Sequence, residues 1–396
     1  MLNVMKPESV GMSSERLGRI PQFIQDYLDR GIIAGAVTLV ARHGEVVHLE
    51  AQGYRWREAR ASMEPDTIFS LMSMTKPIVS TALMMLWEEG RCRLDDPISQ
   101  WLPRYAGQQV LEYGELRPAQ PVTIRHVLTH TSGMALAHAG EAPAGPDGRP
   151  PSTLREAVDR LAALPLTCQP GTRWQYGVST DVVAVLVEQI SGQPIDRFIH
   201  DRLFTPLGIV DTGYHVPREK IARLAAVYRP QDDGSLTLLR APGYREPSGY
   251  VPGVGGMTGT ALDYYRFCQM LLNGGELDGQ RLLGPLTVHQ MFTNQIGTDK
   301  LVWVRGPGWG FGLGAGVLID TTKAQDALSP GTWSWGGSEG TLFYIDPVED
   351  LIALLMVQIN PYQPSHIRPR FSNVVAQAIT KSCRDKPPRV MGYEEI

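Results

Sequence analysis

The chain has 396 residues, of which 43% are hydrophobic and 20% charged, the ordinary balance of a folded globular protein. Its formal net charge of −4 gives no electrostatic reason to expect nucleic acid or an anionic membrane as a partner. No apolar run is long enough to span a bilayer, and residues 1–12 lack the apolar core of a signal peptide. We therefore expect a cytoplasmic protein with one large domain or two closely packed domains.

The N-terminal part predicts a helix followed by a β-hairpin. Ser13 or Ser14 caps a helix that ends near Gly31, with Pro21 as the one residue that speaks against it. Two strands then follow at residues 36–40 and 46–49, joined by a turn at 42–45.

The middle of the chain is mainly helical in its apolar spacing. Five helices are expected at residues 78–87, 124–129, 154–164, 181–191 and 194–203. Gly90 suits the C-terminal cap of the first, and Thr123 the N-terminal cap of the second. Residues 137–152 are rich in proline and glycine and predict a surface loop.

From Tyr228 onward the pattern changes to short strands and glycine turns. Thr260 caps a helix at 261–273, and Asp278-Gly279 signals a hairpin. Two long strands at 332–346 and 351–358 and a helix at 370–382 complete the chain.

Strands at both ends with helices between them predict a mixed α/β (α+β) fold. We expect one antiparallel sheet built from both chain ends and flanked by helices, with a mainly helical domain inserted. The expected sheet domain comprises residues 1–75 and 225–396, and the inserted domain comprises residues 76–224. The seam between two such domains is a favoured place for a pocket.

A Ser-x-x-Lys pair, Ser73 and Lys76, stands at the start of the first buried helix. Residues three apart on a helix are neighbours, so the amine can reach the hydroxyl. A buried lysine can act as the base that a serine needs to become a nucleophile. On spacing alone, an exposed lysine on the first helical turn explains the pair equally well.

Two further candidates are Tyr176 and the segment Trp335-Gly336-Gly337-Ser338. A phenol near an ammonium can relay protons, although an aromatic residue in a loop usually serves packing. The paired glycines indicate close approach by a ligand or by another part of the chain, and neighbouring N–H groups suit an oxyanion hole. A bulge or a tight crossing is the alternative explanation.

Three other patterns carry less weight. Residues 336–340 match Gly-x-Ser-x-Gly, but they lie within a predicted strand instead of the strand–turn–helix that a nucleophile elbow needs. His126 and His130 have the spacing of a zinc pair, yet Val127 stands where the metalloprotease motif has glutamate. Four widely spaced cysteines fit neither a disulfide framework nor a metal site: Cys92, Cys168, Cys268 and Cys383. The sequence predicts no metal and no cofactor.

Several segments, in order along the chain, resemble the serine β-lactamase and penicillin-binding-protein superfamily. They are residues 73–76, 90–97, 122–133, 170–176, 206–213, 253–257 and 335–337. The likeness is closest to the class C β-lactamase-like branch and, within it, to the family VIII carboxylesterases.

The resemblance implies a role for each matching residue. Ser73 would be the nucleophile, Lys76 its base and Tyr176 a proton shuttle. The backbone N–H groups of Ser73 and Ser338 would form the oxyanion hole. Trp335, Gly336, Gly337 and Val178 would contact the substrate.

Two departures from the β-lactamase pattern favour an ester substrate. Val178 stands where the Tyr-x-Asn element has asparagine, and Trp335-Gly336-Gly337 replaces Lys-Thr-Gly. The lost lysine would have met a β-lactam carboxylate, an interaction worth about 1.5–3 kcal/mol. We therefore expect a serine carboxylesterase acting on small or short-acyl esters, with no nucleic-acid or membrane partner. A β-lactamase, a D-alanyl peptidase, an acyltransferase and a non-catalytic sensor remain alternatives, and the sequence leaves the oligomeric state open.

Overall fold

Strands from the two ends of the chain form one antiparallel sheet of eight strands. The computed structural model of the chain describes residues 3–134, 136, 141–145, 148–246 and 249–384. The sheet order is β12-β13-β14-β15-β16-β1-β2-β3. The strands are β1 (Gly35–Arg42), β2 (Glu45–Trp56), β3 (Ala61–Ser62), β12 (Trp309–Phe311), β13 (Gly316–Leu318), β14 (Trp333–Gly336), β15 (Leu342–Asp346) and β16 (Leu351–Met356). The antiparallel pair β1–β16 joins the N-terminal and C-terminal strands and confirms the expected sheet.

The single strand expected at residues 332–346 is wrong, because the chain turns back on itself there. β14 and β15 pair with each other in an antiparallel hairpin, with Trp335 opposite Phe343. Gly340 adopts a φ of +100°, which side-chain-bearing residues rarely reach, and so permits the turn. The apolar pattern is continuous through both strands, and only the glycines mark the reversal.

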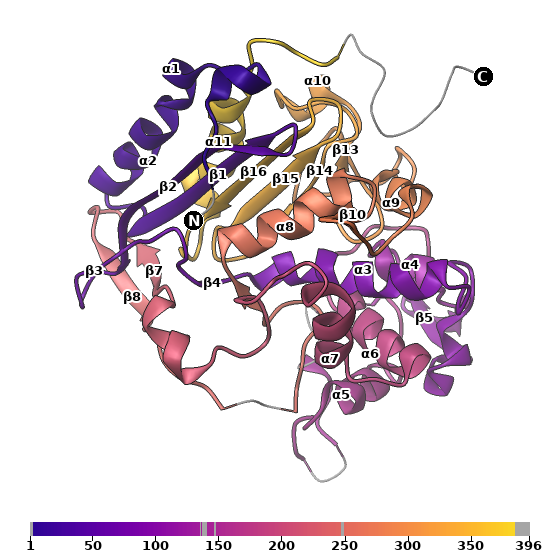
Figure 1. Cartoon of the computed structure of the whole chain (residues 1–396). Helices are drawn as coiled ribbons and strands as arrows, with labels where there is room; N and C mark the ends of the chain where they lie inside the picture. The colour runs from indigo at the N-terminus through magenta and orange to yellow at the C-terminus, as the bar shows by residue number, and fades with distance from the viewer. Residues whose placement is uncertain (1–2, 135, 137–140, 146–147, 247–248, 385–396) are drawn as a thin grey trace.

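Helices cover both faces of the sheet (Figure 1). α2 (Arg19–Asp29) and α11 (Ile367–Ala376) pack on one face, and α8 (Ala261–Leu272) packs on the other, against β1 and β16. Every residue of β16 is buried, as expected of a strand covered on both sides. α8 begins at the predicted cap, where Thr260 Oγ1 accepts the Asp263 N–H at 3.1 Å.

Two helix boundaries differ from the sequence prediction because of prolines. The N-terminal helix is split at Gly18 into α1 (Ser14–Leu17) and α2, since Pro21 has no N–H to continue the hydrogen-bond ladder. The last helix begins at Ile367, before Pro369, because proline is tolerated in a first turn. Arg368 therefore belongs to the helix.

A helical layer lies beside the sheet and packs around α3 (Thr75–Glu88) and α6 (Ser179–Ser191). The other members are α4 (Ile124–Leu128), α5 (Leu154–Leu161), α7 (Ile195–Ile199) and a π-helical turn (His200–Phe204). Gly90 has a φ of +73° after α3, and Thr123 Oγ1 accepts the His126 N–H at 3.3 Å, so both predicted caps are confirmed. The predicted surface loop at 137–152 lies partly outside the described residues.

Smaller elements complete the fold. Two short helices are α9 (Pro285–Phe292) and α10 (Thr321–Ala324). Four pairs of short strands lie outside the large sheet: β4 (Phe69–Ser70) with β9 (Thr258–Gly259), β5 (Gln109–Glu112) with β6 (Glu115–Pro118), β7 (Val227–Pro230) with β8 (Leu236–Arg240), and β10 (Glu276–Leu277) with β11 (Gln280–Arg281). The last pair forms the hairpin predicted at Asp278-Gly279.

The division into a sheet domain and an inserted helical domain stays a prediction. All eight strands of the large sheet fall within the first expected range, and α3 to α7 fall within 75–199.

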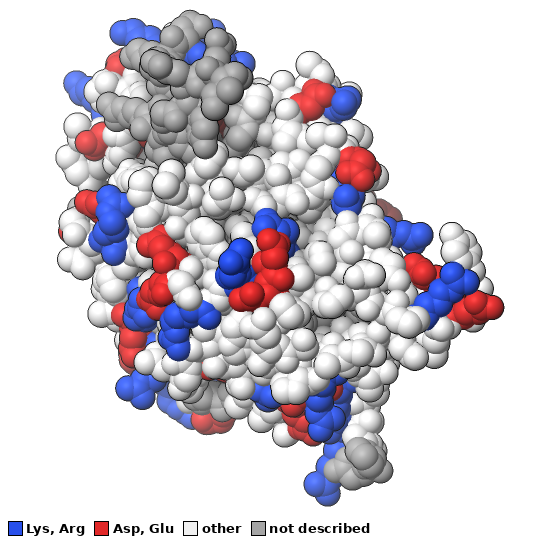
Figure 2. Space-filling view, turned by 90° about the vertical axis from the view of Figure 1, so that its right-hand side faces the viewer, with Lys and Arg blue, Asp and Glu red and all other residues white. Residues whose placement is uncertain are grey.

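Among the described helices none is both long and apolar enough to cross a membrane. On the face shown in Figure 2, basic and acidic side chains lie next to each other and do not gather by sign.

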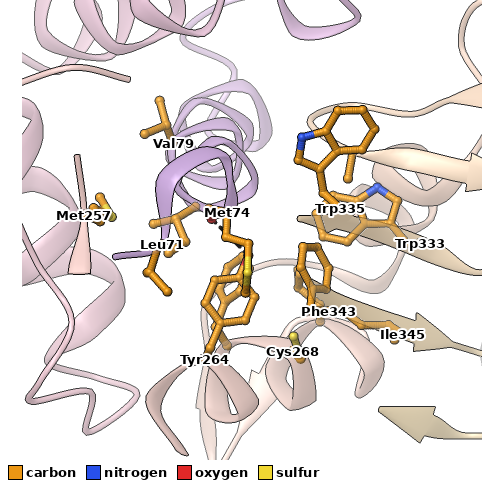
Figure 3. Packing of buried hydrophobic residues seen from close by; sticks show 14 of the residues in the cluster. Leu71, Met74, Val79, Met257, Tyr264, Cys268, Trp333, Trp335, Phe343 and Ile345 are labelled. Carbon is orange, nitrogen blue, oxygen red and sulfur yellow. Dashed lines mark hydrogen bonds between the residues drawn. The ribbon is translucent and has the colours of Figure 1, made fainter. Parts of the chain in front are cut away.

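The start of α3 packs between α8 and the sheet (Figure 3). Leu71 and Met74 are fully buried there, beside Tyr264 of α8 and Phe343 of β15. The Tyr264 hydroxyl donates a 3.0 Å hydrogen bond to the Met74 carbonyl, and its ring lies 5.1 Å from that of Phe343. Close packing on two sides therefore fixes the backbone around Ser73.

Candidate active site

Ser73 lies in a 3₁₀ turn (Met72–Met74) between β4 and α3. Met72, directly before it, has a φ of +47°, a left-handed conformation that costs a non-glycine residue on the order of 1–3 kcal/mol. Gly255 passes close to the Met72 backbone, where a Cβ would lie 3.6 Å away. Such local strain, held in place by packing, is typical of functional sites.

Lys76 points back at Ser73 from the first turn of α3. Its Nζ lies 3.0 Å from Ser73 Oγ and 2.6 Å from the Val254 carbonyl oxygen. The side chain is 3% exposed, so the alternative of an exposed lysine is wrong. No carboxylate of a described residue lies within ion-pair distance of this amine, which is unusual for a buried lysine.

Asp181 supports Lys76 indirectly. The buried Asp181 carboxylate accepts the Val254 N–H at 2.9 Å, and the carbonyl of that same residue faces Lys76. Gly253 makes the approach possible, because a Cβ there would lie 2.2 Å from the Thr180 carbonyl oxygen. The sequence analysis missed Asp181, although a carboxylate at the start of an otherwise apolar helix was a usable signal.

Tyr176 is held beside Lys76 by other aromatic residues. Its ring centroid is 4.7 Å from Lys76 Nζ, and its hydroxyl oxygen accepts a 3.0 Å hydrogen bond from Trp335 Nε1. Trp174 stacks on Tyr176, with ring centroids 5.8 Å apart and planes 14° apart. Ser73, Lys76, Tyr176 and Trp335 are thus brought together from distant parts of the chain.

His130 belongs to this aromatic group as a neutral side chain. Its ring lies 4.8 Å from the Tyr176 ring, and burial together with the positive charge of Lys76 holds its pKa well below the usual value. His126 has a different task, since its Nδ1 accepts the Thr123 N–H at the start of α4. Among the described residues, no group of three His, Cys, Asp or Glu side chains is placed to hold a metal ion.

Ser338 lies in the turn between β14 and β15. Its N–H donates no hydrogen bond to another described residue, whereas the neighbouring Gly337 N–H donates to Thr341. A Cβ on Gly337 would lie 2.5 Å from the Leu71 carbonyl oxygen, and one on Gly336 would lie 2.7 Å from Arg368 Cζ. The two glycines therefore allow other parts of the chain to approach, and the turn lies against the backbone leading to Ser73.

Ser73, Tyr176, Trp335 and Ser338 border a cavity of about 460 Å³. It is lined by Ser73, Tyr176, Trp303, Val304, Arg305, Trp309, Ala324, Asp326, Trp335, Gly336, Gly337, Ser338, Leu342, Tyr362, Gln363, His366, Ile367, Arg368, Pro369 and Ser372. Val178 is absent from this lining, because its side chain is fully buried in the core at the start of α6. The structure does not bring Val178 to the cavity.

Two arginines of the lining were not foreseen from the sequence. Arg305 lies over the Trp309 ring at 3.8 Å, and Arg368 lies over the Tyr362 ring at 3.5 Å. Burial lowers the pKa of each guanidinium to about 10, so both stay charged at neutral pH. Both residues come from segments far from Ser73 in sequence, and nothing local marked them as pocket residues.

Comparison with known proteins shows the family to which the chain belongs. The family described as Beta-lactamase matches residues 20–377. Esterase EstB of Burkholderia gladioli is 35% identical over 351 residues, covering 82% of this chain and 86% of EstB. Lovastatin esterase of Penicillium rubens is 28% identical over 370 residues, covering 84% and 91% of the two chains.

A solved structure extends the similarity to the whole fold. The structure of EstCE1, described as a hydrolase with promiscuous acyltransferase activity, superposes with a TM-score of 0.79 at 26% identity. The match covers 93% of this chain and 99% of EstCE1. The chain belongs to the Beta-lactamase family and is an esterase-like serine hydrolase of that fold.

Proposed function

We propose that the protein hydrolyses small or short-acyl carboxylic esters through a covalent acyl-enzyme on Ser73. The observation that carries this proposal is the 3.0 Å contact between Lys76 Nζ and Ser73 Oγ at the edge of the cavity. A serine hydroxyl becomes a useful nucleophile only when a neighbouring base accepts its proton.

These positions support the following steps. Ser73 Oγ forms a bond to the ester carbonyl carbon while its proton passes to Lys76, beside which the Tyr176 ring lies. The ester C–O bond then breaks, and the leaving alcohol takes up the proton. Water attacks the acyl-enzyme in the second half of the cycle and releases the acid, restoring the Ser73 hydroxyl.

The oxyanion that forms in both halves needs hydrogen-bond donors. The backbone N–H groups of Ser73 and Ser338 are our candidates, because Ser338 borders the cavity and its N–H has no partner among the described residues. Donors fixed in advance near a developing negative charge are often the largest single contribution to such reactions.

Trp335 supports an ester over a β-lactam as the substrate. It supplies no positive charge for a β-lactam carboxylate, and its indole N–H is engaged with Tyr176. An aromatic lining and a cavity of about 460 Å³ suit a compact, partly apolar ester. The similarity to EstB and to lovastatin esterase agrees with this choice.

The direct test compares Ser73→Ala with Ser70→Ala as a matched control three residues away. We expect Ser73→Ala to lower kcat for p-nitrophenyl acetate by at least about 10³-fold, because the nucleophile is lost. Ser70→Ala should retain wild-type activity, and circular dichroism should show both variants folded. Activity retained in Ser73→Ala would refute the proposal, and nitrocefin turnover exceeding ester turnover would replace the ester by a β-lactam.

Acyl transfer to an alcohol is a second candidate, favoured by the similarity to EstCE1. The same acyl-enzyme would be attacked by an alcohol in place of water. Adding a primary alcohol to the p-nitrophenyl acetate assay should then yield the new ester, measured by gas chromatography. Product consisting only of acetic acid would exclude this candidate.

A further inference from the structure

Arg368 reaches from the first turn of α11 to the turn that holds Ser338. Its Nη2 donates a hydrogen bond to the Gly337 carbonyl oxygen, and its Nε donates to the Gly340 carbonyl oxygen at 3.3 Å. The guanidinium lies 3.5 Å from the Tyr362 ring centroid, and Gly336 leaves room for it because a Cβ there would collide with it. Three contacts thus fix its orientation.

The carbonyl that Arg368 binds belongs to the same peptide unit as the Ser338 N–H. That unit consists of Gly337 C=O and Ser338 N–H, which point in opposite directions across a planar trans amide. The Gly337 oxygen also accepts the Gly340 N–H at 3.1 Å, so the carbonyl side carries two donors. The Ser338 N–H has no hydrogen-bond partner among the described residues, and Ser338 itself borders the cavity.

A cation on a peptide carbonyl strengthens the N–H of that peptide as a donor. Hydrogen bonds polarise one another along a chain, and a charged donor produces the larger effect. No carboxylate of a described residue lies within ion-pair distance of Arg368, so its charge is not neutralised by a fixed partner. Its positive charge therefore acts on the peptide and on the adjoining cavity.

We propose that Arg368 is a positioning residue for the oxyanion hole, where its guanidinium holds and polarises the Gly337–Ser338 peptide so that the Ser338 N–H binds the developing oxyanion. This inference rests on the proposed ester hydrolysis through Ser73. Arg368 contacts the peptide and not the reacting atoms, so removing it weakens stabilisation of the transition state more than binding of the substrate.

A purely structural role is the competing explanation, because other contacts also hold this turn. Thr341 accepts the Gly337 N–H, Arg240 pairs with Glu339 at 2.7 Å, and the Ile359 N–H donates to the Glu339 carbonyl. These contacts do not involve Arg368, and none of them places a charge on the Gly337 carbonyl. The two explanations therefore predict different kinetic effects.

The experiment uses Arg368→Ala and Arg368→Lys, with Arg370→Ala as the control. Arg370 is exposed on the same helix and lies outside the cavity lining. We measure kcat and KM for p-nitrophenyl acetate and the inhibition constant of an aryl trifluoromethyl ketone. That ketone adds the Ser73 hydroxyl to form a tetrahedral oxyanion, with the proton passing to the base.

We expect Arg368→Ala to lower kcat by about 10- to 100-fold, with KM changed less than about threefold. The loss of kcat should be smaller than that caused by removing an oxyanion-hole donor, because the Ser338 N–H stays in place and only its polarisation is lost. Affinity for the trifluoromethyl ketone should fall by the same factor as kcat/KM. Added methylguanidine should restore part of kcat in Arg368→Ala. Arg368→Lys should lie between wild type and alanine, and Arg370→Ala should match wild type.

Two results would overturn the proposal. The first is wild-type kcat in Arg368→Ala. The second is a loss that appears in KM and melting temperature with no loss of affinity for the trifluoromethyl ketone, and without rescue by methylguanidine. If Arg368→Ala does not fold, Arg368→Lys decides by the same criteria. Failure of the proposed function would appear separately, either as no turnover of p-nitrophenyl acetate by the wild type or as turnover that Ser73→Ala leaves unchanged.

Discussion

At the scale of single residues, the environment of Lys76 is the most informative feature of the site. The amine is buried and meets two oxygen acceptors, the Ser73 hydroxyl and the Val254 carbonyl. Among the described residues, no carboxylate lies within ion-pair distance of the amine. Lys76 is therefore not part of a structural ion pair, and its amine is placed directly against the Ser73 hydroxyl.

Replacing Lys76 by methionine tests this role directly. The unbranched apolar side chain fills the same buried space but cannot accept a proton. We expect kcat for p-nitrophenyl acetate to fall by about 10²–10⁴-fold, the usual contribution of a general base. Stopped-flow kinetics measures the acylation rate, and a thermal melt shows whether the variant is folded. A folded Lys76→Met variant that is acylated at the wild-type rate would contradict the role of Lys76 as a base.

Trp335 makes a second prediction at this scale. Phenylalanine at this position keeps the aromatic wall but removes the indole N–H that donates to Tyr176. The lost hydrogen bond is worth about 1 kcal/mol, so kcat should fall about fivefold. Steady-state kinetics measures kcat, and an unchanged kcat in Trp335→Phe would show that the bond is only structural.

Sequence reasoning located some site residues and missed others for a physical reason. Ser73 and Lys76 are predictable because helical spacing makes them neighbours wherever the helix lies. Arg368 and Asp181 act on backbone groups of remote segments, so their importance depends on tertiary packing. Val178 illustrates the opposite error, since its position in a motif suggested a contact that its burial in the core does not provide.

At the scale of elements, the β14–β15 turn connects stability with catalysis. Gly340 has a φ of +100°, and a Cβ there would lie 2.6 Å from Val357 Cγ2. Gly340→Ala should therefore destabilise the protein by about 1–3 kcal/mol through backbone strain and also lower kcat, because the turn carries Ser338.

Gly44 offers a matched control for that variant. It lies in the β1–β2 hairpin with a φ of +79°, and its Cβ would meet nothing within 4 Å. Gly44→Ala should cost stability through strain alone and leave kcat unchanged. Urea unfolding and p-nitrophenyl acetate kinetics separate the two effects, and equal kcat in both variants would show that the β14–β15 turn is not part of the site.

His48 on β2 predicts how the sheet responds to pH. The ring is buried, lies 2.8 Å from Thr38 Oγ1 of β1, and has its pKa lowered by burial to about 4. The unfolded chain binds a proton below about pH 6.5, whereas the folded protein does not until about pH 4, so stability falls as the pH falls through that interval. At pH 5 the loss from this group is about 2 kcal/mol relative to pH 7.5.

The variant His48→Gln isolates this contribution, because glutamine keeps a polar group near Thr38 and does not titrate. Urea unfolding at pH 7.5 and pH 5 should show a smaller drop in unfolding free energy for His48→Gln than for the wild type. An equal drop in both proteins would assign the pH dependence to other buried groups.

The strand prediction at residues 332–346 failed at this same scale. An apolar pattern reports burial, and β14 and β15 are buried alike. Periodicity therefore could not separate one long strand from two paired ones. The sequence suggests a site at Gly336 and Gly337, and these glycines both border the cavity and lie at the β14–β15 reversal.

At the scale of the whole molecule, one buried ion pair ties the chain ends to the sheet. Arg42 Nη2 lies 2.8 Å from Glu349 Oε2, and Arg42 also donates to the carbonyl oxygens of Val10, Gly11 and Lys381. The N-terminal segment, the β1–β16 pair and the segment after α11 thus meet at one guanidinium. The antiparallel sheet was predictable because strands occur at both ends of the sequence. The contacts of Arg42 were not, because its partners are far from it in sequence.

Arg42→Met should destabilise the protein by about 3–5 kcal/mol, because it leaves Glu349 buried without its main partner. None of these residues lines the cavity, so kcat of the folded fraction should stay at the wild-type level. Adding Glu349→Leu should recover part of the stability. Urea unfolding measures both, and a loss of kcat without a loss of stability would contradict this separation.

Intact-protein mass spectrometry after rapid acid quenching tests the central claim most directly. The protein is mixed with p-nitrophenyl acetate for milliseconds to seconds, and the quenched sample is mapped by peptide sequencing. We predict one added acetyl group, located on Ser73, which appears with the burst of p-nitrophenol and disappears as substrate is exhausted. Turnover without any acylated protein, or an acetyl group on a residue other than Ser73 that turns over at the rate of hydrolysis, would contradict the account.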